Sequence, residues 1–71
     1  MVTVVWMGTP PSSCDVCKAP LVDEFYDAKT THGPWGNLCA GCFKTIGIGL
    51  GLGRGQHYVK NADGEFAKTE G

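Results

Sequence analysis

The sequence has no long hydrophobic run and no marked excess of charge of either sign. Its most apolar segment is MVTVVWMG at the N-terminus, which is far too short to span a bilayer and carries neither a basic region nor a small-residue cleavage site. Lysine and arginine number six against seven aspartates and glutamates, which gives a net charge of −1. These absences predict a protein that is not exported and has no membrane partner, in the reducing environment of a cytoplasm.

The sequence also lacks the motifs of several enzyme classes. It has no His-x-Glu motif of the kind that zinc deaminases use, no Walker motif and no GxGxxG fingerprint. His32 and Asn37 are of the types that nucleases of the His-Asn-His kind carry around a zinc finger, but the paired histidine that binds their catalytic metal is missing. We therefore predict that the protein is not an enzyme and that both histidines, His32 and His57, are exposed turn residues.

Cysteine is the residue type that carries the clearest pattern. A chain of 71 residues buries a small apolar core and needs a disulfide, a metal or a partner subunit to stabilise it. Its four cysteines, Cys14, Cys17, Cys39 and Cys42, form two CxxC pairs that 21 residues separate. Each pair can direct two thiolates at one ion from a tight turn, and two pairs complete a tetrahedral set of ligands. The pattern predicts one structural Zn²⁺ bound by the four cysteines.

Three other uses of the cysteines stay open on sequence alone. Two disulfides would suit an oxidising compartment better than a cytoplasm. A thioredoxin-like redox pair would leave the second CxxC unexplained. An iron tetrathiolate uses the same four sulfurs, and the sequence does not distinguish it from zinc. A closed set of four thiolates leaves no position for a reactive water, so a zinc ion here would stabilise the fold rather than catalyse a reaction.

The elements expected around the cysteines predict a single small α+β zinc-stabilised domain over residues 1–71. A zinc knuckle, a β-hairpin and a short helix over 40–46 give the order of a treble-clef finger, and a zinc ribbon without the helix is the alternative. An N-terminal strand over 2–6 and a C-terminal hairpin around the turn NADG complete the predicted fold. The expected segments are a strand and linker over 1–13, the zinc finger over 14–46, a glycine-rich segment over 47–57, the hairpin over 58–68 and a loose tail over 69–71.

Every second residue is glycine between Gly47 and Gly55. We expect Gly47 to end the helix in the left-handed conformation. If the rest of the run is extended, its glycines share one face, and a tryptophan, Trp6 or Trp35, can pack closely against that bare backbone. A flexible loop and a phosphate-binding loop are the alternatives, the second because exposed N–H groups would lie near basic side chains.

Two functional hypotheses follow from these features. The first is a protein-binding module, favoured by the near-neutral charge and by the apolar N-terminal strand, whose edge could pair with a partner or with a second copy in a homodimer. The second is a nucleic-acid-binding finger, because no acidic residue falls between Cys39 and Asn61 and an aromatic residue expected to be exposed, Tyr58, lies among basic ones. Its candidate residues are Lys44, Arg54, His57, Tyr58 and Lys60.

The segment from Cys14 to Tyr58 resembles small zinc-finger proteins encoded by tailed bacteriophages and prophages. The resemblance is carried by both CxxC pairs, by the DAKT and GPW motifs between them, and by GIGLGLGRGQHY after the second pair. It implies a zinc role for the four cysteines and expression in the cytoplasm of a bacterial host. It further implies a protein that binds and modulates a host or phage protein complex rather than an enzyme.

Overall fold

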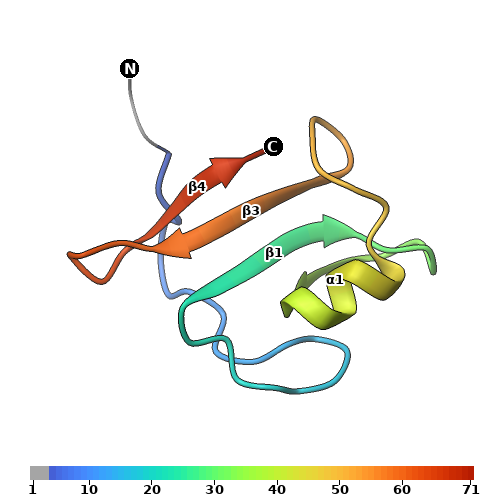
Figure 1. The fold of residues 1–71 in the computed structure, drawn as a ribbon, viewed down its shortest axis with the longest axis horizontal. Coiled ribbons are helices and arrows are strands. Elements are labelled where there is room, and N and C mark those ends of the chain that lie inside the picture. The colour runs from blue at the N-terminus through green and yellow to red at the C-terminus, as the bar shows by residue number, and fades with distance from the viewer. Residues whose placement is uncertain (1–3) are drawn as a thin grey trace.

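Four antiparallel strands and one short helix make up the described part of the chain, residues 4–71 of a computed structural model (Figure 1). The strands are β1 (Glu24–Lys29), β2 (Trp35–Leu38), β3 (Gly55–Lys60) and β4 (Phe66–Glu70), and the helix is α1 (Ala40–Ile46). The strands form one sheet in the order β2-β1-β3-β4, so β1 and β3 lie at its centre. The predicted α+β class and the helix predicted over 40–46 are confirmed.

The first hairpin joins β1 to β2, as the sequence predicts. Its turn passes through Gly33, whose φ of 108° favours glycine. Thr30 closes the turn, because its backbone N–H and its hydroxyl both donate to the Pro34 carbonyl. The register places Tyr26 opposite Leu38 at the end of β2. This pairing returns the chain to the point where the second CxxC pair begins.

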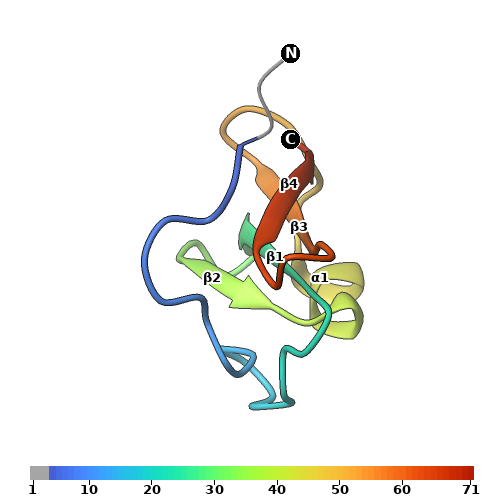
Figure 2. The same cartoon turned by 90° about the vertical axis from the view of Figure 1, so that its left-hand side faces the viewer.

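The pairing of β1 with β3 sorts the aromatic side chains onto two faces. Phe25 lies opposite Tyr58 on one face, and their rings stack at a centroid distance of 5.1 Å. Trp6 packs edge-on against both rings at 5.2 and 5.4 Å, and Phe66 packs against Phe25 at 5.0 Å. Aromatic residues bury large apolar areas, so these contacts form much of the hydrophobic core. Figure 2 shows the N-terminal segment covering this side of the sheet.

Helix α1 lies on the opposite side of the sheet (Figure 2). Phe43 of the helix stacks on Tyr26 of β1 at 4.1 Å, and Tyr26 stacks in turn on His57 of β3 at 4.2 Å. The helix ends where the Gly47 N–H donates to the Phe43 carbonyl at 2.8 Å. Gly47 has a φ of −71°, so its predicted left-handed conformation is wrong; the chain leaves the helix extended and forms a bridge with Thr30.

The glycine run is a folded loop rather than an extended segment. Gly49 and Gly51 have φ values of 125° and 122°, a region that residues with a side chain rarely adopt. The loop closes through a bridge between Gly51 and Gly55, the residue at which β3 begins. The predicted bare face is therefore wrong, because the glycines turn the backbone instead of facing one way. Close packing occurs at Gly55, against Ala28 of β1 and not against a tryptophan.

The second hairpin joins β3 to β4 through the predicted NADG turn. The Asn61 side-chain oxygen accepts two backbone N–H groups of the turn, each at 3.0 Å. The pairing reaches beyond the predicted span of 58–68 at both ends. The loose tail predicted over 69–71 is wrong as far as Glu70, because this residue pairs with His57 and extends the sheet.

The N-terminal strand predicted over 2–6 lies partly outside the described residues. Its described part pairs with β4 through a bridge between Val5 and Ala67, and two backbone hydrogen bonds of 2.7 and 2.8 Å flank the bridge. This short pairing is not a continuous strand, but it holds Trp6 over the core. We expected the edge of this N-terminal strand to pair with a partner, but one of its two sides already pairs with β4.

Candidate metal centre

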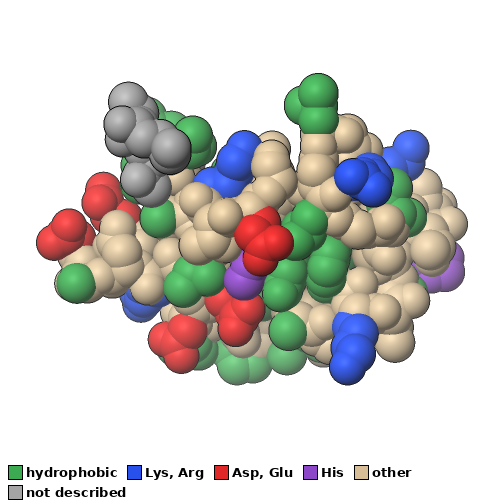
Figure 3. Space-filling model, turned by 45° about the horizontal axis from the view of Figure 1, so that its top comes forward, with side chains coloured by type: hydrophobic (Ala, Val, Ile, Leu, Met, Phe, Trp, Pro, Cys, Tyr) green, Lys and Arg blue, Asp and Glu red, His purple; other side chains and the backbone are tan. Residues whose placement is uncertain are grey.

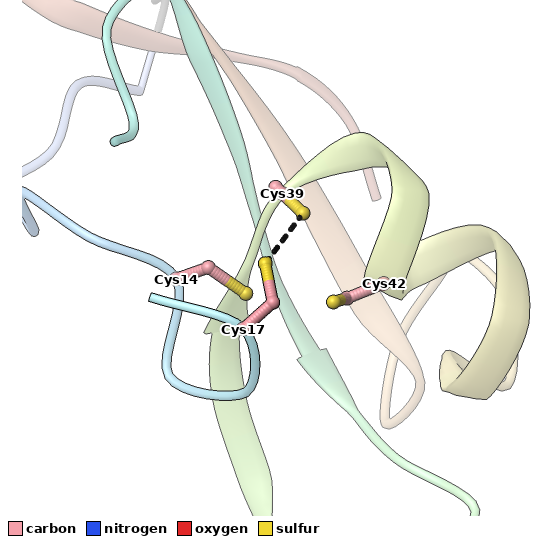
Figure 4. Close-up of side chains that lie close together, drawn as sticks. All are labelled: Cys14, Cys17, Cys39 and Cys42. Carbon is pink, nitrogen blue, oxygen red and sulfur yellow. Dashed lines mark hydrogen bonds between the residues drawn. The ribbon is translucent and has the colours of Figure 1, made fainter. Parts of the chain in front are cut away.

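The first cysteine pair lies in a tight turn, the knuckle (residues 14–18), which precedes β1. The Lys18 N–H donates to the Cys14 carbonyl at 3.0 Å, and Lys18 has a φ of 66° that reverses the chain. The Val16 N–H donates to the Cys14 sulfur at 3.4 Å. The knuckle therefore directs the side chains of Cys14 and Cys17 to the same point (Figure 4).

The second pair lies at the start of α1. Cys39 is the residue before the helix and has extended backbone, and Cys42 lies within the first turn. The Cys39 carbonyl accepts the Phe43 N–H at 2.9 Å, which begins the helical hydrogen bonding. N–H groups at the start of a helix carry partial positive charge, and this charge favours the thiolate form of nearby cysteines.

Asp15 fixes the knuckle to the strand that leads into the helix. Its N–H donates to the Asn37 carbonyl at 2.9 Å, and its Oδ2 atom accepts the Asn37 N–H at 2.7 Å. Two residues after Asn37, the chain reaches Cys39. The two pairs therefore meet because one aspartate inside the first CxxC joins the edge of β2. Sequence reasoning missed this role, although the position of Asp15 between two cysteines is a signal for it.

The four cysteine sulfurs lie together between the knuckle and α1. All four lie within 4.8 Å of one another, and Cys17 and Cys39 are 3.6 Å apart (Figure 4). A tetrahedron of sulfurs around an ion at the usual zinc–sulfur distance of about 2.3 Å has edges of about 3.8 Å. No disulfide links any of the four cysteines, all of which are described. The residues present therefore fit one metal ion, and the cluster predicted from the two CxxC pairs forms in the structure.

Hydrogen bonds and neighbouring thiols shift the pKa values of Cys14 and Cys42 in opposite directions. Burial raises the pKa of Cys14, but hydrogen bonds from backbone N–H groups, including those of Cys17 and Cys39, outweigh this effect and lower the pKa to about 6. A side-chain hydrogen bond with Cys17, burial and the neighbouring thiols raise the pKa of Cys42 to about 12. The cluster thus accepts a first negative charge readily and resists further charge unless a cation compensates it.

Phe43 connects the metal site to the sheet. It follows Cys42 directly and starts the ring stack that passes through Tyr26 to His57. The far end of the stack is held by Thr69, whose hydroxyl oxygen lies 3.2 Å from the Nδ1 atom of His57. Sequence reasoning did not find this stack, because its members come from three elements that pair only in the folded chain.

Two of the five candidate nucleic-acid-binding residues do not lie on an open surface. Tyr58 is 6% exposed, and its hydroxyl donates to the Gln56 side chain at 3.1 Å. Its predicted role as an exposed stacking residue is wrong, because the β1–β3 pairing places it in the core. The prediction that His57 is an exposed turn residue is also wrong. It lies in β3, stacked on Tyr26, with its Nε2 atom 2.8 Å from a carboxylate oxygen of Glu24.

The three basic candidates are exposed but come from different elements. Lys44 lies in α1, Arg54 in the glycine loop and Lys60 at the end of β3. Acidic, basic and apolar side chains are interspersed on the face in Figure 3, and this face carries no continuous basic surface. His32 is exposed in the turn between β1 and β2, as predicted. The structure thus brings the four cysteines together and does not bring the five other candidates into one site.

Comparisons of the chain with protein-family models, with curated proteins and with solved structures find no match. The assignment of the site therefore depends on its own geometry. Within residues 4–71, no helix is both long enough and apolar enough to cross a membrane. The chemistry that the described residues support is the binding of one metal ion by four cysteines.

Proposed function

We propose that the protein is a structural-zinc module that binds another protein and has no catalytic activity. The observation that carries the proposal is the meeting of four sulfur atoms, all within 4.8 Å of one another, from two separate segments of the chain. Four thiolates are one of the donor sets of structural zinc sites. The treble-clef interpretation belongs to the same proposal. It is supported by a second cysteine pair that begins a helix, where a zinc ribbon would have a second knuckle.

Zinc is the proposed ion because it takes four thiolates in tetrahedral geometry and undergoes no redox change. The apparent binding free energy of structural zinc in small peptides is about 10 to 16 kcal/mol at neutral pH. The free energy of unfolding of a whole domain is about 5 to 15 kcal/mol. The described chain buries seven hydrophobic side chains, and one of them is the ligand Cys14. We therefore expect the metal-free chain to be largely unfolded.

The non-enzymatic part of the proposal follows from the closed site. Four protein ligands leave a tetrahedral ion without a position for water or substrate. Protein binding is supported by large apolar side chains that remain exposed, among them Val16, Trp35 and Leu52. The resemblance of the segment Cys14 to Tyr58 to phage zinc-finger proteins extends the proposal to a host or phage protein as partner, in the cytoplasm of a bacterial host.

Nucleic-acid binding is the weaker candidate, and we do not propose it. It requires an aromatic platform among basic side chains, and the ring expected to supply it, that of Tyr58, is buried against Phe25. The remaining cations, on Lys44, Arg54 and Lys60, would neutralise few phosphates. Binding through so few contacts is weak, and its affinity falls as the salt concentration rises.

Removal of the metal tests the proposal. Protein purified from cells should hold one zinc per chain, and a strong chelator should abolish its near-ultraviolet circular dichroism until zinc is added back. Cys17→Ser removes an exposed ligand and should lower the zinc content, whereas Ser13→Ala, an exposed neighbour, should leave it unchanged. A chain that keeps its tertiary signal after zinc is removed would show that the proposed role of the metal is wrong.

A further inference from the structure

An apolar pocket of ≈ 230 Å³ lies beside the metal centre, and we call it the Trp35 pocket. It is formed by the knuckle, by β2, by the turn between β1 and β2 and by the last residue of α1. Val16 and Trp35 are among its lining residues and are 52% and 48% exposed, while Leu38 is fully buried and Ile46 closes the pocket from α1. Gly36 also lines it. A Cβ atom added there would touch the Asp15 carboxylate at 3.4 Å and the Leu38 side chain at 3.5 Å, so these two residues border the pocket beside β2.

The edge of β2 next to this pocket has free hydrogen-bonding groups. Trp35 lies opposite Lys29 of β1, but the Lys29 N–H donates to the Arg54 carbonyl and the Lys29 carbonyl accepts the Ile48 N–H, at 2.9 and 3.3 Å. Lys29 therefore turns its backbone groups away from β2, and Trp35 turns its own outward. Outside the β1–β2 pairing, no backbone group of residues 4–71 bonds to the Trp35 N–H or carbonyl. A free donor and acceptor on an outer strand are suited to an added strand.

Asp15 limits how far an added strand can run. It occupies the edge opposite Asn37 with two hydrogen bonds, so a segment that pairs with Trp35 must end before it reaches that position. The second oxygen of its carboxylate accepts no hydrogen bond within the described chain, and the side chain is exposed. The Lys18 ammonium lies near, but it donates to the backbone carbonyl of Asp15 and not to the carboxylate. The end of the site therefore presents a carboxylate oxygen that is free to accept a hydrogen bond.

We infer that the Trp35 pocket binds the N-terminus of a partner protein; this inference rests on the protein-binding role proposed above. An antiparallel segment beside β2 has its N-terminal end at Asp15, where the carboxylate attracts the terminal ammonium group. Its second residue pairs with the backbone of Trp35. Its first residue lies opposite Gly36, and alternation along a strand places that side chain on the same face as Leu38, in the pocket. The site thus selects a large apolar first residue.

The charge of Asp15 determines the direction of the bound segment. A parallel segment would end at the same place with a carboxylate, which Asp15 repels. A second copy of this chain is also unsuited to the edge. Pairing Trp35 with its counterpart would bring residue 33 of each copy to the position that Asp15 of the other already fills.

Short synthetic peptides test the inference on the zinc-loaded full chain. The first peptide starts with leucine and continues with polar residues, the second is the same peptide with an acetylated N-terminus, and the third starts with serine. The free leucine peptide should bind at least about tenfold more tightly than either of the others, as expected for a charge-assisted hydrogen bond and a buried side chain. It should also slow hydrogen exchange at the Trp35 N–H.

Variants of two aspartates supply the matched control. Asp15→Asn keeps an oxygen for the Asn37 N–H and removes the charge, so it should abolish the preference for the free N-terminus. Asp23→Asn, at another exposed acid, should leave the preference intact. Equal binding of free and acetylated peptides, no binding of any peptide, or exchange protection elsewhere than at Trp35 would each overturn the inference. If zinc content and fold are normal in those cases, the structural-zinc proposal stands without it.

Discussion

Gly55 is the residue at which the glycine loop meets the sheet most closely. A Cβ atom added there would lie 2.7 Å from the Gly49 carbonyl oxygen and 2.8 Å from the Cβ of Ala28. The first atom belongs to the backbone of the loop and the second to β1, so neither can move aside easily. Gly55→Ala should therefore lower the free energy of unfolding by about 1 to 3 kcal/mol, the usual cost of overpacking. Urea denaturation of the zinc-loaded protein measures this difference.

Gly41 supplies the control for that substitution. It lies inside α1, and a Cβ added there would meet nothing within 4 Å. Gly41→Ala should leave the stability unchanged or raise it by up to about 1 kcal/mol, because alanine favours helix more than glycine does. Equal stability of the two variants would show that the close approach at Gly55 does not affect the free energy of unfolding.

Single residues also mark the limits of prediction from sequence. The four cysteines could be placed in one cluster because a CxxC spacing directs two sulfurs to one point by local geometry alone. Tyr58 could not be placed, because its neighbours Arg54 and Lys60 give the stretch a polar character. Its burial is decided by pairing with Phe25, a residue far away in sequence. Local pattern thus determined the ligands, and long-range pairing determined the core.

At the scale of elements, the N-terminal segment acts as a cover for one face of the sheet. Its pairing with β4 holds Trp6 edge-on against Phe25 and Tyr58. Trp6 is partly buried, so Trp6→Ala should lower the free energy of unfolding by about 2 kcal/mol, less than aromatic-to-alanine changes cost at fully buried positions. Circular dichroism during urea denaturation measures the loss.

Trp35 is the matched tryptophan for this comparison. It is 48% exposed at the Trp35 pocket and makes no ring contact with the aromatic core. Trp35→Ala should change the stability by less than about 1 kcal/mol, since surface substitutions outside the core usually have small effects. A Trp6 variant as stable as the Trp35 variant would mean that the N-terminal segment does not cover the core in solution.

The elements differ in how well their sequences predict them. The helix after Cys39 and the hairpin at NADG were predicted because short helical and turn signals are local. For the run from Gly47 to Gly55 the sequence leaves an extended segment and a loop both open, because alternating glycine fits both an extended strand and a series of turns. The choice between them depends on the bridge that closes the loop at the start of β3. That bridge is fixed by β3 lying beside β1, which no local signal reveals.

At the scale of the whole molecule, the two faces of the sheet are stabilised in different ways. One face carries an aromatic core under the N-terminal segment, and the other carries α1 and the cysteine cluster (Figure 2). The ring stack from Phe43 to His57 joins the second face to the sheet. Loss of the metal should release the knuckle from α1 and leave the helix held to the sheet only by packing such as this ring stack, so we expect the metal-free chain to be largely unfolded.

X-ray absorption at the zinc edge of the purified protein tests the central claim most directly. Our account predicts a single zinc ion surrounded by four sulfur atoms at about 2.3 Å, with no nitrogen or oxygen ligand. An absorption edge of iron in place of zinc, a mixed set of sulfur and lighter ligands, or a folded protein without metal would contradict it.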